Sequence, residues 1–161
     1  MAQTDMFLKV DGIEGESLDD RHKGEIQISA YSLAAANAGS AGASSGSSVG
    51  KAQIQDLSFA KAVDKSSPNL FINCCNGKPI PTIVLTVRKA GEKPQEYLTI
   101  TLTDSFVSSF SHVGSDDGKL PTESVSLNFS KIKFEYKTQL ADGSLGPAVA
   151  KTYDIKANKI S

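Results

Sequence analysis

The sequence predicts a mainly β protein, an antiparallel β-barrel of two packed sheets with one short α-helix and one extended loop. Apolar and polar residues alternate with period two in several segments, which is typical of strands because successive side chains face opposite sides. The only convincing helix start lies at Ser66-Ser67-Pro68. Because no helices alternate with the strands, the pattern favours antiparallel sheets over a doubly wound parallel sheet.

Two rows of apolar residues predict the first strands, which we expect to face the core. The rows consist of Met6, Leu8 and Val10, and of Ile26, Ile28 and Ala30. The polar stretch 11–23 between them predicts a connection.

The predicted helix spans residues 68–76. Pro68 suits the first helical position because its missing N–H would have no partner there, and Ser66 or Ser67 can cap the free amides behind it. Gly77 is the expected residue just past the C-terminus, and Pro79 prevents the helix from continuing.

Two further segments predict strands with one face toward the core. Ile83, Leu85 and Val87 form one row. In 98–103, aliphatic residues alternate with Thr99, Thr101 and Thr103, which suits a sheet with one solvated face. We expect Phe106 and Phe110 to continue the inward phase of this strand. The threonines are outward candidates for a subunit contact, for a channel surface or for plain solvent exposure.

The segment 125–136 changes parity in its middle. Val125, Leu127 and Phe129 precede Ser130 and Lys131, and the apolar positions after them are Ile132, Phe134 and Tyr136. One extra residue would flip the faces, so we expect a bulge or sharp bend where a long strand passes from one sheet to the other. The residues flanking 131–137 are likewise outward candidates for a subunit contact, for a channel surface or for plain solvent exposure. A turn at 141–143 and a last strand at 149–157 complete the pattern.

Size and charge limit the classes of function. At 161 residues we expect one domain, 1–161, with its own core. Seventeen basic against eighteen acidic residues give a net charge of −1, which disfavours nucleic acid and anionic lipid as partners. No apolar window suits membrane insertion, and the N-terminus resembles no signal peptide, so we expect cytoplasmic synthesis. The adjacent Cys74 and Cys75 suit packing as small hydrophobic residues better than a disulfide or a metal site.

The sequence offers no convincing catalytic, cofactor or metal site, so we expect no enzyme. The segment 46–51 lacks the glycine and the Ser or Thr that a phosphate-binding loop needs. His22 and His112 are expected among polar loop residues, and Ser111, His112 and Asp116 lack a strained elbow or an oxyanion-hole sequence. The acidic pairs 19–20 and 116–117 are expected in solvated loops.

The segment 37–50, NAGSAGASSGSSVG, has low complexity and is longer than most connections in a compact domain. It cannot contribute to a core. Either it is a mobile surface loop, or it is an arm that becomes ordered against a neighbouring subunit.

Several short segments, in the same order and spread over nearly the whole chain, resemble the haemolysin-coregulated protein (Hcp) family, the tube proteins of bacterial type VI secretion. The segments are DMFLK at 5–9, GES at 15–17, QDLSF at 55–59, DKSSPNL at 64–70, RKAG at 88–91, EYL at 96–98, TE at 122–123 and LNF at 127–129.

The resemblance implies a homo-hexameric ring, head-to-tail stacking of rings into a conduit, and small effector proteins carried in the lumen. It also implies a surrounding contractile sheath, a VgrG-like spike protein, and secretion to the extracellular space without a signal peptide. It favours the arm as the interpretation of 37–50.

Two groups of site residues follow from the resemblance. For contact with effectors in the lumen we expect Ser111, Gly114 and Ser115. For ring stacking we expect Asn37, Gly39, Ser40, Gly42, Ser44, Ser45, Gly46, Ser47 and Ser48. The alternative functions are a barrel that binds a small ligand in its interior and a hydrolase that depends on His112.

Overall fold

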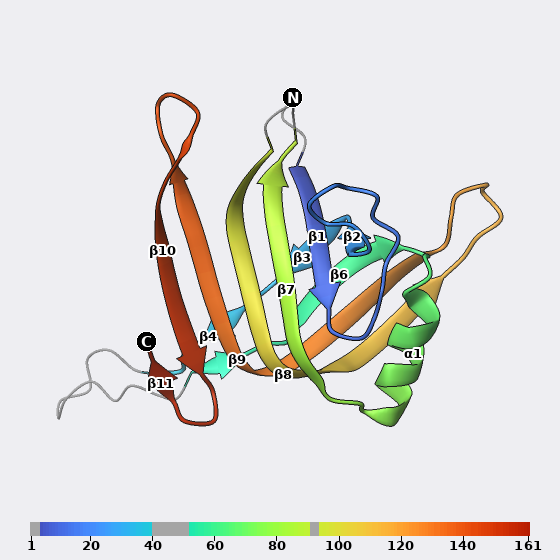
Figure 1. Cartoon of the computed structure of the whole chain (residues 1–161). Helices are drawn as coiled ribbons and strands as arrows, with labels where there is room; N and C mark the ends of the chain where they lie inside the picture. The colour runs from blue at the N-terminus through green and yellow to red at the C-terminus, as the bar shows by residue number, and fades with distance from the viewer. Residues whose placement is uncertain (1–3, 40–51, 91–93) are drawn as a thin grey trace.

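The computed structural model describes residues 4–39, 52–90 and 94–161, and it confirms the mainly β, antiparallel fold (Figure 1). The elements in chain order are β1 (Thr4–Val10), β2 (Ile26–Ile28), β3 (Ala30–Ser32), β4 (Ala35–Ala36), β5 (Gln53–Ile54), β6 (Leu57–Ala62), α1 (Ser67–Asn76), β7 (Ile80–Lys89), β8 (Gln95–Val113), β9 (Thr122–Gln139), β10 (Leu145–Asp154) and β11 (Lys159–Ile160). Within the described ranges, no helix has the length and apolar character needed to cross a bilayer.

The pairing of strands nearly returns on itself. The main path runs β11-β10-β9-β8-β7-β1-β2, while β6 pairs with both β9 and β3. Strands β2 and β3 are separated only by Ser29, whose backbone N–H donates to the Ala60 carbonyl of β6 at 2.8 Å. The segment 26–32 therefore links the end of the main path to β6 and closes the circuit around the core.

The inward rows of β1, β2 and β7 are largely confirmed. Leu8, Val10, Ile26, Ile28, Ile83, Leu85 and Val87 are buried. Met6 is half-buried, and Ala30 is exposed because it lies beyond Ser29 in β3, where the chain has changed partner. The opposite face of β1 and β7 also holds buried residues, Phe7, Thr86 and Arg88, so both faces of these strands are covered there.

The expected change of parity in β9 is confirmed, and β8 changes parity at the same level. In β9 the buried residues are Leu127 and Phe129 before the switch and Ile132 after it. In β8, Asp104 has a left-handed backbone with φ +51°, and its carbonyl accepts a hydrogen bond from Ser130 Oγ at 3.3 Å. Both strands therefore turn the same corner together.

The corner overturns the expected phase of β8. After Asp104 the buried residues are Ser105 and Val107, while Phe106 is exposed. A further register shift between Val107 and Ser109 then returns Phe110 to the side of Val125. Both irregularities depend on backbone geometry that alternation cannot reveal.

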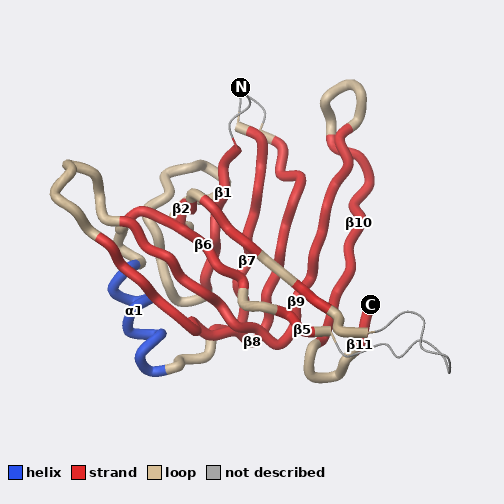
Figure 2. The backbone as a smooth tube through the Cα atoms, turned by 180° about the vertical axis from the view of Figure 1, so that it is seen from behind, coloured by secondary structure: helices blue, strands red, loops and turns tan. Residues whose placement is uncertain are grey.

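Helix α1 matches the expected 68–76 to within one residue. Gly77 has the left-handed φ of +63° that ends a helix, and Ser66 is at the N-cap but makes no capping hydrogen bond with its side chain. Leu70 is fully buried and Cys74 packs against the core, whereas Cys75 is exposed, contrary to its expected packing. Figure 2 shows α1 outside the strands, on the side away from β10.

The C-terminal strand begins and ends earlier than expected. The turn at 141–143 is present, with Gly143 at φ +87°, and β10 spans Leu145–Asp154 rather than 149–157. Asn158, also left-handed at φ +50°, reverses the chain so that β11 pairs with the end of β10.

The strain at the corner leads to a prediction for Asp104. A β-branched side chain in the left-handed region costs about 1–2 kcal/mol, so Asp104→Val should lower the free energy of unfolding by that amount. Asp104→Gly, which is free of this penalty, should remain close to wild type. Urea unfolding measures both variants, and equal losses in the two would show that the side chain, not the backbone, sets the corner.

Candidate functional site

The outer surface of strands β3, β6, β9 and β8 carries a set of small residues, here called the small-residue face. Cross-strand register places its members in two rows, Ala30, Ala60, Ser124 and Ser111, and Ser32, Ser58, Ser126 and Ser109. Ser58 Oγ and Ser126 Oγ lie 2.9 Å apart. None of the eight side chains is charged or larger than serine, so the face offers little that would hold a protein surface tightly.

The expected lumen residues lie at the end of this face. Ser111 belongs to it, and Gly114 and Ser115 follow β8 in the exposed connection to β9. Asp117 accepts a hydrogen bond from the Lys119 N–H at 3.0 Å and another from the Ser115 side chain, and these lower the pKa of its carboxyl. The structure therefore brings Ser111, Gly114 and Ser115 to one edge of the molecule; their contact with effectors stays a prediction.

The expected stacking residues are described only in part. Asn37 and Gly39 are exposed, and the Gly39 N–H donates to Asn37 Oδ1 at 3.0 Å. Ser40, Gly42, Ser44, Ser45, Gly46, Ser47 and Ser48 lie outside the described residues. The same holds for the segment 46–51 that was compared with a phosphate-binding loop.

A buried ion pair lies beneath the small-residue face, inside the barrel. Lys61 Nζ donates to Glu123 Oε1 at 2.5 Å, and the two side chains are 0% exposed. Ser67 Oγ donates to the same oxygen at 2.6 Å, and His112 Nδ1 lies 2.8 Å from the other. Burial would raise the pKa of the Glu123 carboxyl, but the hydrogen bonds from its three partners outweigh burial and lower that pKa.

This cluster ties the start of α1 to the barrel. Ser67 is the first residue of α1, and its hydroxyl also accepts the Asp64 N–H at 3.1 Å. Lys61 contacts Asp64 at 3.1 Å as well. A carboxylate next to the first helical turn also interacts favourably with the helix dipole. Ser67 therefore acts as an anchor for α1, a role that the expected capping by serine does not describe.

A second polar cluster lies on the other side of the sheet, under the loop 11–25. Arg88 donates to both Asp5 and Asp19, and its guanidinium carbon lies 4.8 Å from the centre of the Phe7 ring. The hydrogen bond from Arg88 is the main cause that lowers the pKa of Asp19. Asp19 is therefore a structural ion-pair partner rather than the solvated residue expected from sequence, whereas Asp20 is exposed.

His22 closes this second cluster; it lies in the loop 11–25, as expected from sequence, but it is buried against an aromatic ring rather than placed among polar residues alone. It is 7% exposed, and its ring stacks on Phe7 with centroids 4.5 Å apart. Its two ring nitrogens lie 2.8 Å from Glu25 and 2.6 Å from Glu96. A β-carbon at Gly15 would collide with the backbone of residues 25 and 26, so the loop can lie this close only with glycine there.

The arrangement of these residues gives no support for hydrolysis. His112 faces Glu123, and in a strand its neighbour Ser111 points to the opposite face. Among the described residues, His, Cys, Asp and Glu nowhere gather in a group of three that could hold a metal ion. A cleft of about 870 Å³ beside the loop 11–25 is open and lined by side chains of both charges, including Lys9, Asp11, Arg21 and Lys23.

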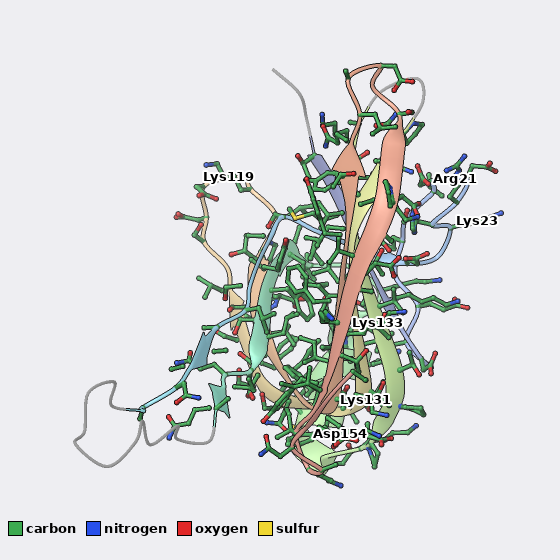
Figure 3. All side chains as sticks on the ribbon, turned by 90° about the vertical axis from the view of Figure 1, so that its left-hand side faces the viewer. Arg21, Lys23, Lys119, Lys131, Lys133 and Asp154 are labelled. Atoms are coloured by element: carbon green, nitrogen blue, oxygen red, sulfur yellow. The ribbon has the colours of Figure 1, made fainter. Side chains whose placement is uncertain are left out.

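Figure 3 shows that the connection after β8 and the loop 11–25 lie on opposite sides of the molecule. Lys119, in the connection after β8, lies on one side, while Arg21 and Lys23 of the loop 11–25 lie on the other. The small-residue face and the second polar cluster are therefore separate surfaces.

Alternation along the strands could have revealed the buried ion pair. Lys61 is in phase with Leu57 and Phe59, and Glu123 is in phase with Val125 and Leu127, so both charges fall on core-facing positions. His22 offered no comparable signal because its burial depends on contacts with residues 7 and 96, which are distant in sequence.

Comparisons with known proteins agree on one family. The sequence model of the family described as "Type VI secretion system effector, Hcp" matches residues 7–136. Protein hcp1 of Pseudomonas aeruginosa is 44% identical over 156 residues, which cover 96% of each chain. The crystal structure of Hcp1 from Salmonella typhimurium is 40% identical, with 100% of both chains covered and a TM-score of 0.79. The structure of a type six secretion system protein is 25% identical, covers 99% of this chain and 100% of its own, and has a TM-score of 0.93.

The buried ion pair leads to a prediction for Lys61 and Glu123. Removing one partner leaves an uncompensated buried charge, so Lys61→Met should lower the free energy of unfolding by about 3–5 kcal/mol. The double variant Lys61→Met/Glu123→Leu, which buries no charge, should lose less than Lys61→Met alone. Urea unfolding of the two single variants and the double variant tests this. Losses that simply add would show that the two side chains act independently.

Proposed function

The chain belongs to the Hcp family of type VI secretion proteins, and from this premise we propose that it is a structural subunit of the type VI secretion tube. Residues 1–161 act as one domain, without a catalytic site or cofactor. Six copies form a ring, rings stack head to tail, and the resulting conduit carries small effector proteins. The protein is made in the cytoplasm and is secreted to the extracellular space.

The observation that carries this proposal is the small-residue face. A conduit needs a wall that meets cargo without holding it, and eight alanine and serine side chains across four strands supply such a wall. Tight binding instead relies on large buried anchors such as tryptophan, tyrosine and arginine. We therefore assign this face, with Ser111, Gly114 and Ser115 at its edge, to the lumen.

The remaining surfaces fit the partners that such a tube requires. We expect the arm that includes Asn37 and Gly39 to contact the next ring, since both residues are exposed. The outer surface of the ring would face contractile sheath proteins, and the end of the tube would meet a VgrG-like spike protein. Nucleic acid and membrane insertion have no part in this function, in line with the net charge of −1.

Mass and shape test the assembly. Native mass spectrometry of the purified chain should give six copies of the 17.0 kDa subunit, and negative-stain images should show rings with an axial hole. A heterologous contact whose rotation divides a full turn closes in this way. A monomer at all concentrations would contradict the proposal and favour the barrel that binds a small ligand.

Cargo retention tests the lumen. Ser115→Trp should leave the mass of the hexamer unchanged. It should reduce the amount of small effector protein that co-purifies with tagged hexamers, because the bulky indole side chain narrows the channel. Ser161→Trp, at the exposed C-terminus, is the matched control and should retain the wild-type amount. Equal retention by both variants would remove Ser115 from the lumen.

A further inference from the structure

A short two-stranded sheet connects the predicted arm, 37–50, to the barrel. In this sheet β4 pairs with β5, with Ala35 opposite Ile54 and Ala36 opposite Gln53. The two strands form a sheet of their own, apart from the main path, and are here called the stalk. The stalk lies in the lower part of the subunit, where Figure 1 labels β4 and Figure 2 labels β5. Because the arm is the chain between β4 and β5, the direction of the stalk decides where the arm begins.

The stalk is a bent continuation of the hairpin formed by β3 and β6. Ser32 lies opposite Ser58 in the hairpin, and Ala35 lies opposite Ile54 in the stalk. Two residues separate these pairs on the first strand and three on the second, so the second strand has one residue more. An extra residue on one strand bends a pair of strands, as in a β-bulge. The bend lies at the three residues whose middle member is Asp56.

The carboxylate of Asp56 accepts hydrogen bonds from two other strands. Asn128 Nδ2 of β9 donates to Asp56 Oδ1 at 2.9 Å, and the Ser108 hydroxyl of β8 donates to Asp56 Oδ2. The backbone pairing of β6 with β9 ends with Leu57 opposite Leu127. The bond from Asn128 therefore continues the contact with β9 one residue beyond the last backbone pair.

Ser108 reaches Asp56 because β8 contains a β-bulge. Val107 and Ser109 pair with consecutive residues of β9, so Ser108 between them is an extra residue without a partner in that ladder. A bulge of this kind redirects a side chain out of the regular alternation. Here it allows a hydroxyl of β8 to donate across β9 to the residue that precedes β6.

Apolar packing holds the stalk near the core but does not fix its direction. Leu33 and Ile54 are half-buried and pack against the core. A hollow of about 150 Å³ lies beside the bend, and Ile54, Asp56 and Ile155 are among the residues that line it. Hydrophobic contact is non-directional, whereas hydrogen bonds to a carboxylate are strong and directional. The orientation of the stalk therefore depends on the two donors to Asp56.

We propose that Asp56 is a positioning residue for the arm: its carboxylate, held by Ser108 and Asn128, fixes the direction in which the stalk leaves the barrel. The inference rests on the proposed function, in which the arm contacts the next ring. Stacked rings repeat one contact for every subunit, so each arm must leave its subunit at the same angle. Order that exists before contact also lowers the entropic cost of forming it. Asp56 thus acts on stacking and not on the formation of the hexamer.

Hydrogen–deuterium exchange tests the orientation directly. The Gln55 N–H donates to the Ala34 carbonyl at 2.9 Å, and this bond closes the bend. In Asp56→Ala the backbone amides of β5 and Gln55 should exchange about tenfold faster, because two hydrogen bonds to a charged acceptor are lost. The amide of Ser29, which donates to the Ala60 carbonyl at 2.8 Å outside the stalk, is the internal control and should keep its wild-type rate.

A second experiment measures stacking in variants that keep the hexamer. Ser108→Ala removes a donor to Asp56, whereas Ser108→Thr retains a hydroxyl. Ser126→Ala, the matched control, removes a nearby hydroxyl that bonds to Ser58 instead. All three variants and Asp56→Ala should keep the mass of six 17.0 kDa subunits in native mass spectrometry. In negative-stain images at high concentration, Asp56→Ala and Ser108→Ala should give single rings, while Ser108→Thr and Ser126→Ala should give filaments.

Three results would overturn the role of Asp56. They are unchanged exchange of the stalk in Asp56→Ala, filaments of wild-type length from that variant, and loss of its hexamer, which would indicate a general structural role. A wild-type chain that stays monomeric, or wild-type rings that never stack, would instead refute the proposed function. The exchange experiment measures the stalk within one subunit in either case, so the two failures are distinguishable.

Discussion

The corner shared by β8 and β9 is the constraint on which the rest of the structure depends. Asp104 and Ser130 turn both strands at one level; there β8 parts from β7, and β9 exchanges β10 for β6. Both stretches of β8 contribute to the core, with Leu102 before the turn and Val107 after it, and the outer side of the second stretch belongs to the small-residue face. Helix α1 packs against β8.

The buried ion pair of Lys61 and Glu123 determines where α1 lies relative to strands β6 and β9. A charged pair inside a barrel is a poor source of stability, since its desolvation offsets much of the attraction. Its geometric effect is clearer: Glu123 accepts from Lys61 and Ser67 together, which ties β9 and β6 to the first residue of α1. An apolar pair would fill the same space without fixing where the helix begins. The position of α1 in turn decides which of its residues, among them Phe71 and Ile72, are exposed to solvent.

The sequence predicted what local rules determine. Alternation located most strands, the Pro68 and Gly77 signals bounded the helix, and the parity change in β9 predicted the corner. It missed one backbone feature that alternation does not reveal and one set of contacts between residues distant in sequence. Phe106 was expected to face inward, but the left-handed backbone at Asp104 reverses the phase of β8. His22 was expected among polar loop residues, but Phe7 and Glu96, both distant in sequence, bury it. The expected lumen residues came from the family resemblance, since exposed serines carry no distinguishing pattern.

A protein that acts by assembly has reason to lack recognisable motifs. Catalysis needs a few reactive groups in fixed geometry, which spacing in a sequence can reveal, whereas a ring needs complementary surfaces whose parts are ordinary residues far apart in the chain. Ser58 and Ser126 illustrate this, because each on its own is a serine of the kind that any surface carries. Only the register of β6 and β9 places them side by side in the small-residue face. Such a function can therefore be inferred from the fold, but from sequence only through resemblance to a family.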